Sequence, residues 1–187
     1  MNYVYHGSSI PNLEVIKKHK STHMKEWVYA CHSKAIATIF LSPMHSDLSY
    51  SLSGDGKNYP VELVERKSGM FKKIFNCSGY IYKLDASNFK ENQTGWSAEV
   101  VSNIDEKVIS SEYIDNVYDE LIKLDKEGLI KLYLYPNRPD YVPIDNSDLI
   151  PKVLRWYKNG FNINNFYNIY PELKDKFIEE LEKATKD

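Results

Sequence analysis

Three consecutive residues near the N-terminus, His6, Gly7 and Ser8, combine groups that can hold a polar ligand, and Tyr5 precedes them. They come at the end of an expected strand over residues 3–5. A neutral imidazole offers one hydrogen-bond donor and one acceptor, and a glycine lets a ligand approach the backbone closely. Taken alone, these residues also suit a strand-to-turn junction whose histidine caps backbone groups. Both interpretations stay open at this point.

Other reactive residues lack the spacing of established motifs. His19 and His23 are four residues apart, which suits a shared metal on a helix, but the surrounding lysines repel a cation and favour a solvated surface. Residues 54–58, Gly-Asp-Gly-Lys-Asn, lack the spacing of a phosphate-binding loop and predict a flexible turn. Cys31 and His32 are neighbours on an expected strand, where their side chains point to opposite faces. The sequence therefore predicts neither a metal site nor a thiol nucleophile.

The stretch Tyr-His-Gly-Ser at residues 5–8 resembles the first motif of the ADP-ribosyltransferase superfamily. The similar branch is the one that includes diphtheria toxin and the poly(ADP-ribose) polymerases, and it carries a His-Tyr-Glu triad on three separate strands. Small bacterial and phage proteins that begin with the same four residues are also similar. The resemblance extends over about residues 3–110. It implies that His6, Gly7 and Ser8 face the dinucleotide NAD.

Two later segments are similar to the remaining motifs of that branch. Residues 27–30, Trp-Val-Tyr-Ala, and the following stretch 33–37 resemble the strand and short helix of the second motif. Residues 96–102 resemble the third motif, with Glu99 as the acidic residue. Tyr29 lies 23 residues after the motif histidine, and Glu99 lies 70 residues after Tyr29. The resemblance therefore implies a His6, Tyr29 and Glu99 triad.

The resemblance also implies a role for each residue, in an NAD cleft between two small sheets. His6 would hydrogen-bond the adenosine ribose, and Gly7 would offer its backbone N–H and C=O to the nicotinamide carboxamide. Tyr29 would stack on the nicotinamide ring, and Ser33 would add a hydroxyl to the same amide. Glu99 would accept a hydrogen bond from the nicotinamide ribose and favour the oxocarbenium-like state that forms as the glycosidic bond loosens. Such a reaction needs no metal.

Three other carboxylates compete with Glu99 for the acidic position. Asp105 and Glu106 lie next to an expected turn, Glu106 ranks second, and Glu91 is a further candidate. Ser97 stands two residues before Glu99, where families that modify arginine usually carry an acidic residue. Arginine-specific transfer is therefore not expected.

The leading functional hypothesis is an NAD-dependent ADP-ribosyltransferase that releases nicotinamide and modifies an unknown protein or nucleic-acid acceptor. One alternative is an RNA 2′-phosphotransferase on the same scaffold. That chemistry uses several Arg and His side chains to clasp phosphates, whereas Arg66, Arg138 and Arg155 all lie away from the motifs. The other alternative is a non-catalytic module that binds a nucleotide or a protein partner in the same cleft.

Amino-acid composition, independently of the motifs, excludes several classes of protein. The 187 residues carry 24 Lys and Arg against 26 Asp and Glu, a net charge of −2, which excludes a strongly basic nucleic-acid binder. A hydrophobic share of 42% indicates a folded domain. Two cysteines do not make a disulfide framework, so a reducing cytoplasm is the expected location. We find no signal peptide and no apolar run near the ~20 residues that span a bilayer, so no membrane partner is expected.

The hydrophobic pattern predicts an α+β fold: an ADP-ribosyltransferase-like domain of small, mostly antiparallel sheets over residues 1–139, and a helical extension over residues 140–187 packed on it. A loop or short helix is expected at residues 13–24 and a long loop at residues 42–60. Predicted strands are 3–5, 27–30, 60–65, 70–75, 79–84, 98–102, 106–109 and 129–135. Predicted helices are 33–41, 110–126, 149–158 and 171–183.

Overall fold

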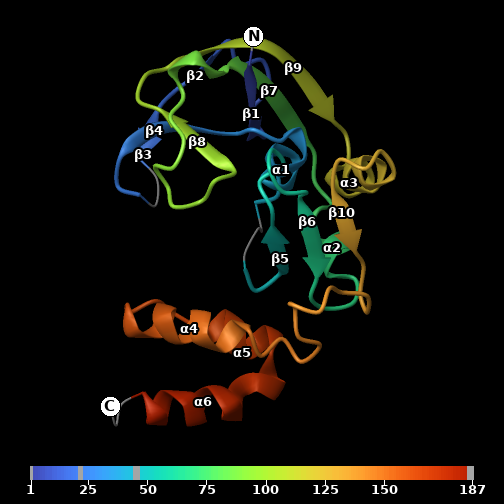
Figure 1. Cartoon of the computed structure of the whole chain (residues 1–187), viewed down its shortest axis with the longest axis vertical. Coiled ribbons are helices and arrows are strands. Elements are labelled where there is room, and N and C mark those ends of the chain that lie inside the picture. The colour runs from blue at the N-terminus through green and yellow to red at the C-terminus, as the bar shows by residue number, and fades with distance from the viewer. Residues whose placement is uncertain (1, 21–22, 44–46, 185–187) are drawn as a thin grey trace.

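The computed structural model describes residues 2–20, 23–43 and 47–184 and confirms the α+β prediction. Two sheets and helix α1 form one end of an elongated molecule, and the C-terminal helices form the other (Figure 1). Strands of the larger sheet are β1 (Tyr3–Ser8), β2 (Val15–Ile16), β3 (His19–Lys20), β4 (Glu26–Cys31), β7 (Gly79–Asp85), β8 (Glu99–Ser102) and β9 (Glu106–Ile114). The smaller sheet consists of β5 (Tyr50–Ser53), β6 (Glu62–Glu65) and β10 (Lys131–Tyr133).

The larger sheet is antiparallel and forks between β1 and β4. Its strand order is β2-β9-β7-β1-β4-β3, and β8 pairs with the β4 strand. β1 pairs with β7 at six positions, from Tyr3 opposite Asp85 to Ser8 opposite Tyr80. In the described chain β1 pairs with β4 only where Tyr5 faces Cys31. The two parts of the larger sheet on either side of the fork are therefore joined at a single bridge.

Side chains along β7 alternate between the two faces of the sheet, as the sequence predicts, and join two separate hydrophobic clusters. Tyr80, Tyr82 and Leu84 pack into one hydrophobic cluster, whereas Ile81 belongs to the cluster on the opposite face. Helix α1 (Lys34–Ile39) lies on that opposite face with its residues buried. A side chain at Gly7 would collide with the backbone carbonyl oxygen of Ala37, so glycine is what lets α1 sit directly on β1.

Residues 70–75 are a helix rather than the predicted strand. Helix α2 (Met70–Ile74) follows Gly69, whose φ of 74° is left-handed, and the Glu65 carboxylate accepts a hydrogen bond from the Phe71 N–H at 2.9 Å. Phe71 and Ile74 are both buried, at a spacing of three residues that suits one face of a helix. Helical spacing of the buried residues and a carboxylate that accepts from the first turn therefore both favour a helix here.

The observed strand pairing differs from the sequence prediction in three further segments. The predicted loop 42–60 contains β5, which pairs with β6, while its residues 44–46 lie outside the described part. β2 and β3 lie within the expected loop or short helix at residues 13–24. β9 extends to Ile114 because that residue pairs with Gly79, so helix α3 (Val117–Lys126) begins later than predicted, with the Asn116 side chain accepting from the Asp119 N–H.

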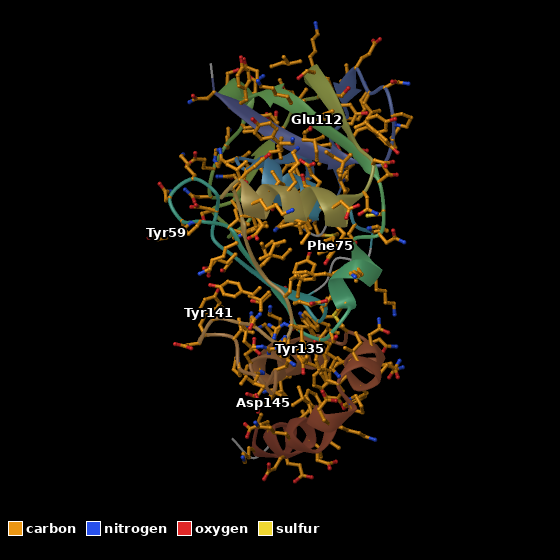
Figure 2. The ribbon with its side chains drawn as sticks, turned by 90° about the vertical axis from the view of Figure 1, so that its right-hand side faces the viewer. Tyr59, Phe75, Glu112, Tyr135, Tyr141 and Asp145 are labelled. Atoms are coloured by element: carbon orange, nitrogen blue, oxygen red, sulfur yellow. The ribbon has the colours of Figure 1, made fainter. Side chains whose placement is uncertain are left out.

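The predicted helical C-terminus forms its own hydrophobic cluster. It contains α4 (Leu149–Lys158), α5 (Asn164–Ile169), which the sequence pattern did not predict, the 3₁₀ turn Pro171–Leu173 and α6 (Lys174–Lys183). Phe166, Tyr170 and Phe177 are fully buried in it, together with Leu48 from the loop before β5. Figure 2 shows Tyr135 and Tyr141 in the connection from the sheets, with Asp145 beyond them toward the helices.

Candidate active site

A cavity of about 410 Å³ lies at the fork of the larger sheet, a size within the usual range of ligand pockets. β1 contributes His6 and Gly7, β4 contributes Tyr29, and β8 contributes Glu99. Helix α1 contributes Ala37, and Phe40 at its C-cap adds further apolar surface. The structure therefore brings four of the six site residues predicted from the sequence to one cavity, from three separate strands.

At the fork, a hydrogen bond from the His6 side chain takes the place of the next backbone hydrogen bond between β1 and β4. The register set by Tyr5 and Cys31 would place Gly7 opposite Tyr29 if the pairing continued. Instead, the carbonyl oxygen of Tyr29 lies 2.7 Å from Nδ1 of His6. Within the described residues, the edge of β1 at Gly7 therefore has no ladder partner in β4 and borders the cavity.

His6 is held as a neutral imidazole with a defined tautomer. A carbonyl oxygen only accepts, so Nδ1 carries the proton that it donates to Tyr29, and Nε2 keeps a lone pair. Burial lowers the pKa of His6; the bond to Tyr29 acts in the opposite direction, and the nearby His19 lowers it further. At neutral pH the side chain therefore offers a hydrogen-bond acceptor at Nε2.

Two histidines that the sequence predicted as a solvated surface line the same cavity. Both are exposed, and each lies beside the Tyr29 ring, with centroids 5.8 Å away for His19 and 5.9 Å for His23. The Nδ1 of His23 lies 3.3 Å from the Tyr29 hydroxyl. Sequence reasoning missed them because β3 and β4 pair to bring them there, and a two-residue strand leaves almost no periodic signal.

Glu99 is half-buried on β8, opposite Cys31 of the neighbouring strand. Burial raises the pKa of its carboxyl group, and the neighbouring Thr94 and His23 act in the opposite direction. Burial and the charge of Glu99 raise the pKa of the Cys31 thiol. Cys31 thus remains a protonated thiol beside the cavity and lacks the thiolate that nucleophilic chemistry needs.

Two predicted site residues lie outside the cavity. The Ser8 hydroxyl accepts a hydrogen bond from the Ile10 N–H at 3.2 Å and forms a local turn. Ser33 occupies the N-cap position of α1 without a side-chain cap bond, and it packs so closely against Gly56 that a Cβ atom there would overlap it. The expected contact of Ser33 with the ligand amide is therefore not supported, since its hydroxyl faces residues 54–58 instead.

The competing carboxylates also lie away from the cavity. Glu106 is buried at the start of β9, with Asn88 3.4 Å from its carboxylate. Glu91 lies 2.7 Å from Lys57, and Asp105 lies 2.9 Å from Lys17. Among these carboxylates only Glu99 lines the cavity with His6 and Tyr29. Geometry therefore favours Glu99 for the acidic position.

The glycine-rich stretch 54–58 forms the predicted turn. The Asp55 carboxylate accepts hydrogen bonds from the backbone N–H groups of Lys57, Asn58 and Tyr59 at 2.8–2.9 Å. These bonds, with that to the Asn58 side chain, hold the pKa of Asp55 far below its usual range against the effect of burial. The loop amides therefore bind the chain's own carboxylate, as in an Asx turn.

Comparisons with protein-family models, with curated proteins and with solved structures return no match. Within the described ranges, no cluster of three or more His, Cys, Asp or Glu side chains has the geometry to hold a metal ion. No helix in the described part has the length and apolar character needed to cross a membrane. A functional assignment therefore depends on the cavity at the sheet fork.

Proposed function

We propose that this chain is an NAD-dependent ADP-ribosyltransferase whose site is the cavity at the sheet fork. The observation that carries the proposal is the convergence of His6, Tyr29 and Glu99 on one cavity. These residues lie on three strands, in the order of the motifs that the sequence resembles. A fourth residue of the same motifs, Gly7, presents a strand edge to the same space.

The strand edge and His6 supply polar contacts suited to a nucleoside. Backbone N–H and C=O groups at an unpaired edge match the donor and acceptor of a carboxamide, as a neighbouring strand would. The Nε2 lone pair of His6 accepts a hydrogen bond from a ribose hydroxyl, and its orientation is fixed through Nδ1 by Tyr29. Gly7 is thus required twice, for the packing of α1 and for access to the backbone.

Tyr29 and Glu99 supply the ring contact and the negative charge that the reaction requires. The Tyr29 ring offers an apolar face for the nicotinamide, which keeps the leaving group aligned. When the bond between C1′ of the ribose and the pyridine nitrogen breaks, its electron pair stays on nicotinamide and positive charge grows on the sugar. A half-buried carboxylate at Glu99 stabilises that charge more strongly than a solvated one.

The arrangement of the arginines argues against the phosphotransferase alternative. Arg66 makes a bidentate pair with Asp148, at 2.9 and 2.7 Å, at the base of the C-terminal helices. Arg138 binds the carbonyl oxygen of Pro143 in the same region, and Arg155 lies on α4. None of the three lines the cavity, so the guanidinium groups that clasp phosphates in that chemistry are lacking there.

The proposal is tested by nicotinamide release from NAD. We expect the wild-type chain to release nicotinamide, and Glu99→Gln to lose at least about a hundredfold in rate, a magnitude typical for removal of one electrostatic contact. Glu91→Gln and Glu106→Gln are matched controls, because they make the same change at carboxylates outside the cavity. Both controls should keep the wild-type rate.

The same experiment separates the enzyme from the non-catalytic alternative. NAD binding by calorimetry without nicotinamide release would indicate a nucleotide-binding module. Equal rates for Glu99→Gln and the two controls would exclude the assigned role of Glu99. Absence of both binding and turnover would overturn the proposal.

A further inference from the structure

Positive charge is concentrated beside the cavity in residues 17–20 and 23–29, which include β3 and the first part of β4 and are called here the β3–β4 hairpin. This segment contains four lysines and one glutamate, a net charge of +3 in a chain whose total is −2. The remainder of the chain is therefore acidic, and the hairpin is where a polyanion would be attracted.

Two of the four lysines have no carboxylate partner within the described residues. Lys17 lies 2.9 Å from Asp105, and Lys18 lies 3.8 Å from Glu26, so each of these two ammonium groups already has a carboxylate partner. Lys20 is exposed on β3, where its cross-strand neighbour is Glu26, and Lys25 is exposed before β4. These two remain available to an external phosphate.

Aromatic rings cluster around Tyr29 on the same hairpin. Tyr29 lies next to His19, His23 and Trp27, with ring centroids 5.8–6.1 Å away, and His23 lies 6.2 Å from Trp27. The ammonium group of Lys25 lies 5.1 Å from the centre of the Trp27 ring. Lysines interleaved with aromatic rings are the usual composition of a single-strand nucleic-acid surface, where bases stack and cations follow the backbone.

The ring cluster extends into the cavity. His19, His23 and Tyr29 line the cavity together with Glu99, whereas Trp27, whose ring centroid lies 6.1 Å from that of Tyr29, is outside the lining. A strand that stacks a base on Trp27 would therefore bring its next nucleotide close to the cavity. The exposed histidines in the lining add hydrogen-bonding groups without closing it.

We propose that the ADP-ribose acceptor is a single-stranded nucleic acid that docks on the β3–β4 hairpin. This inference rests on the proposed transferase function and names its acceptor. An amine or hydroxyl of the docked nucleotide forms a bond to C1′ of the ribose while the C1′–nicotinamide bond breaks. Nicotinamide leaves with the electron pair of that bond, and the proton released by the attacking group passes to the Glu99 carboxylate and then to solvent.

Binding is tested first, without NAD, by fluorescence anisotropy of a labelled oligothymidylate of about 12 nucleotides. The double reversal Lys20→Glu with Lys25→Glu should weaken binding about tenfold. It should also reduce the slope of log affinity against log salt by about 1.4, because two phosphate contacts are lost. The control, Lys126→Glu with Lys158→Glu, changes the charge equally at exposed lysines on α3 and α4 and should bind as wild type.

Trp27→Ala gives an independent readout. It should lower affinity several-fold at every salt concentration and leave the slope unchanged, since stacking releases no counterions. Wild-type protein that fails to bind the strand, or equal losses for the hairpin and control reversals, would overturn the inference.

Transfer is tested next with NAD labelled in the adenylate part. Label on the oligonucleotide that the hairpin reversal reduces and the control reversal leaves at the wild-type level supports the inference. Nicotinamide release with label only on added protein would overturn the inference and leave the transferase proposal intact. No nicotinamide release under any condition would overturn the proposed function itself.

Discussion

The Nδ1 atom of His6 lies 2.7 Å from the carbonyl oxygen of Tyr29 and occupies the place of a backbone ladder bond. This contact connects the two strands on either side of the cavity. It needs a proton on Nδ1, which the neutral imidazole supplies in this tautomer. Because burial lowers the pKa of His6, the folded chain resists a second proton at Nε2. The fork is therefore built around an uncharged imidazole.

A pH dependence of stability follows from His6. The unfolded chain binds a proton near pH 6.5 and the folded chain binds it only at lower pH, so the free energy of unfolding should fall as pH decreases below 6.5. His6→Asn should reduce this loss, because it removes the group that titrates. Urea unfolding between pH 5 and 7 measures the slope of the unfolding free energy against pH for the wild type and for the variant. A steeper slope in the variant would contradict this account.

Gly7→Ala should destabilise the fold by about 1–3 kcal/mol, a typical cost of overpacking. The new methyl group would overlap the carbonyl oxygen of Ala37, and backbone atoms of α1 cannot move as a side-chain end can. Thermal unfolding measures the loss, and Ser9→Ala at the exposed neighbouring position is the control. Unfolding temperatures that agree for wild type and Gly7→Ala would show that α1 shifts freely on β1.

Glu99→Gln should raise the melting temperature at pH 7 while it abolishes turnover. The folded-state pKa of Glu99 is raised by burial, so ionisation costs stability as pH rises through the interval above its usual value of 4.5. An uncharged amide of the same shape avoids that cost. At pH 4, where the carboxyl group is largely protonated, the melting temperatures should converge. A variant that melts below wild type at pH 7 would contradict this explanation.

Asp148→Asn should destabilise the junction with the C-terminal helices by about 3 kcal/mol, because Arg66 is buried and would lose its carboxylate partner. Asp145→Asn is the matched control, since its ion pair with Lys176 is exposed. Limited proteolysis together with urea unfolding would locate the effect. Equal losses for the two variants would show that burial of Arg66 does not set the cost.

The candidate site was predictable from sequence where the chain provides a motif on a strand of normal length. His6, Gly7, Tyr29 and Glu99 fall in this class, and they gather at one cavity, while their roles in NAD chemistry stay predictions. The contribution of His19 and His23 was not predictable, since it depends on pairing between distant short segments.

The fold shows the same limit. The α+β class and the alternation of side chains along β7 were predictable from the spacing of hydrophobic residues. Tyr82 and Ile81, for example, lie in clusters on opposite faces of the sheet. The segment around Phe71 was assigned wrongly, although the three-residue spacing of Phe71 and Ile74 suits one face of a helix. The Phe71 N–H donates a hydrogen bond to the carboxylate of Glu65, in the preceding strand, and this contact favours the helix.

The unequal pairing of β1 has a consequence for amide hydrogen exchange. Six paired positions with β7 hold β1, whereas β4 joins it through one bridge, Tyr5 with Cys31, and shares four pairs with β8. Opening of the β4–β8 unit therefore disrupts few bonds, and its amides should exchange sooner than those of β1 and β7. A ligand that spans the fork would slow exchange mainly in β4 and β8, so that protection pattern would report occupancy of the cavity before any reaction is known.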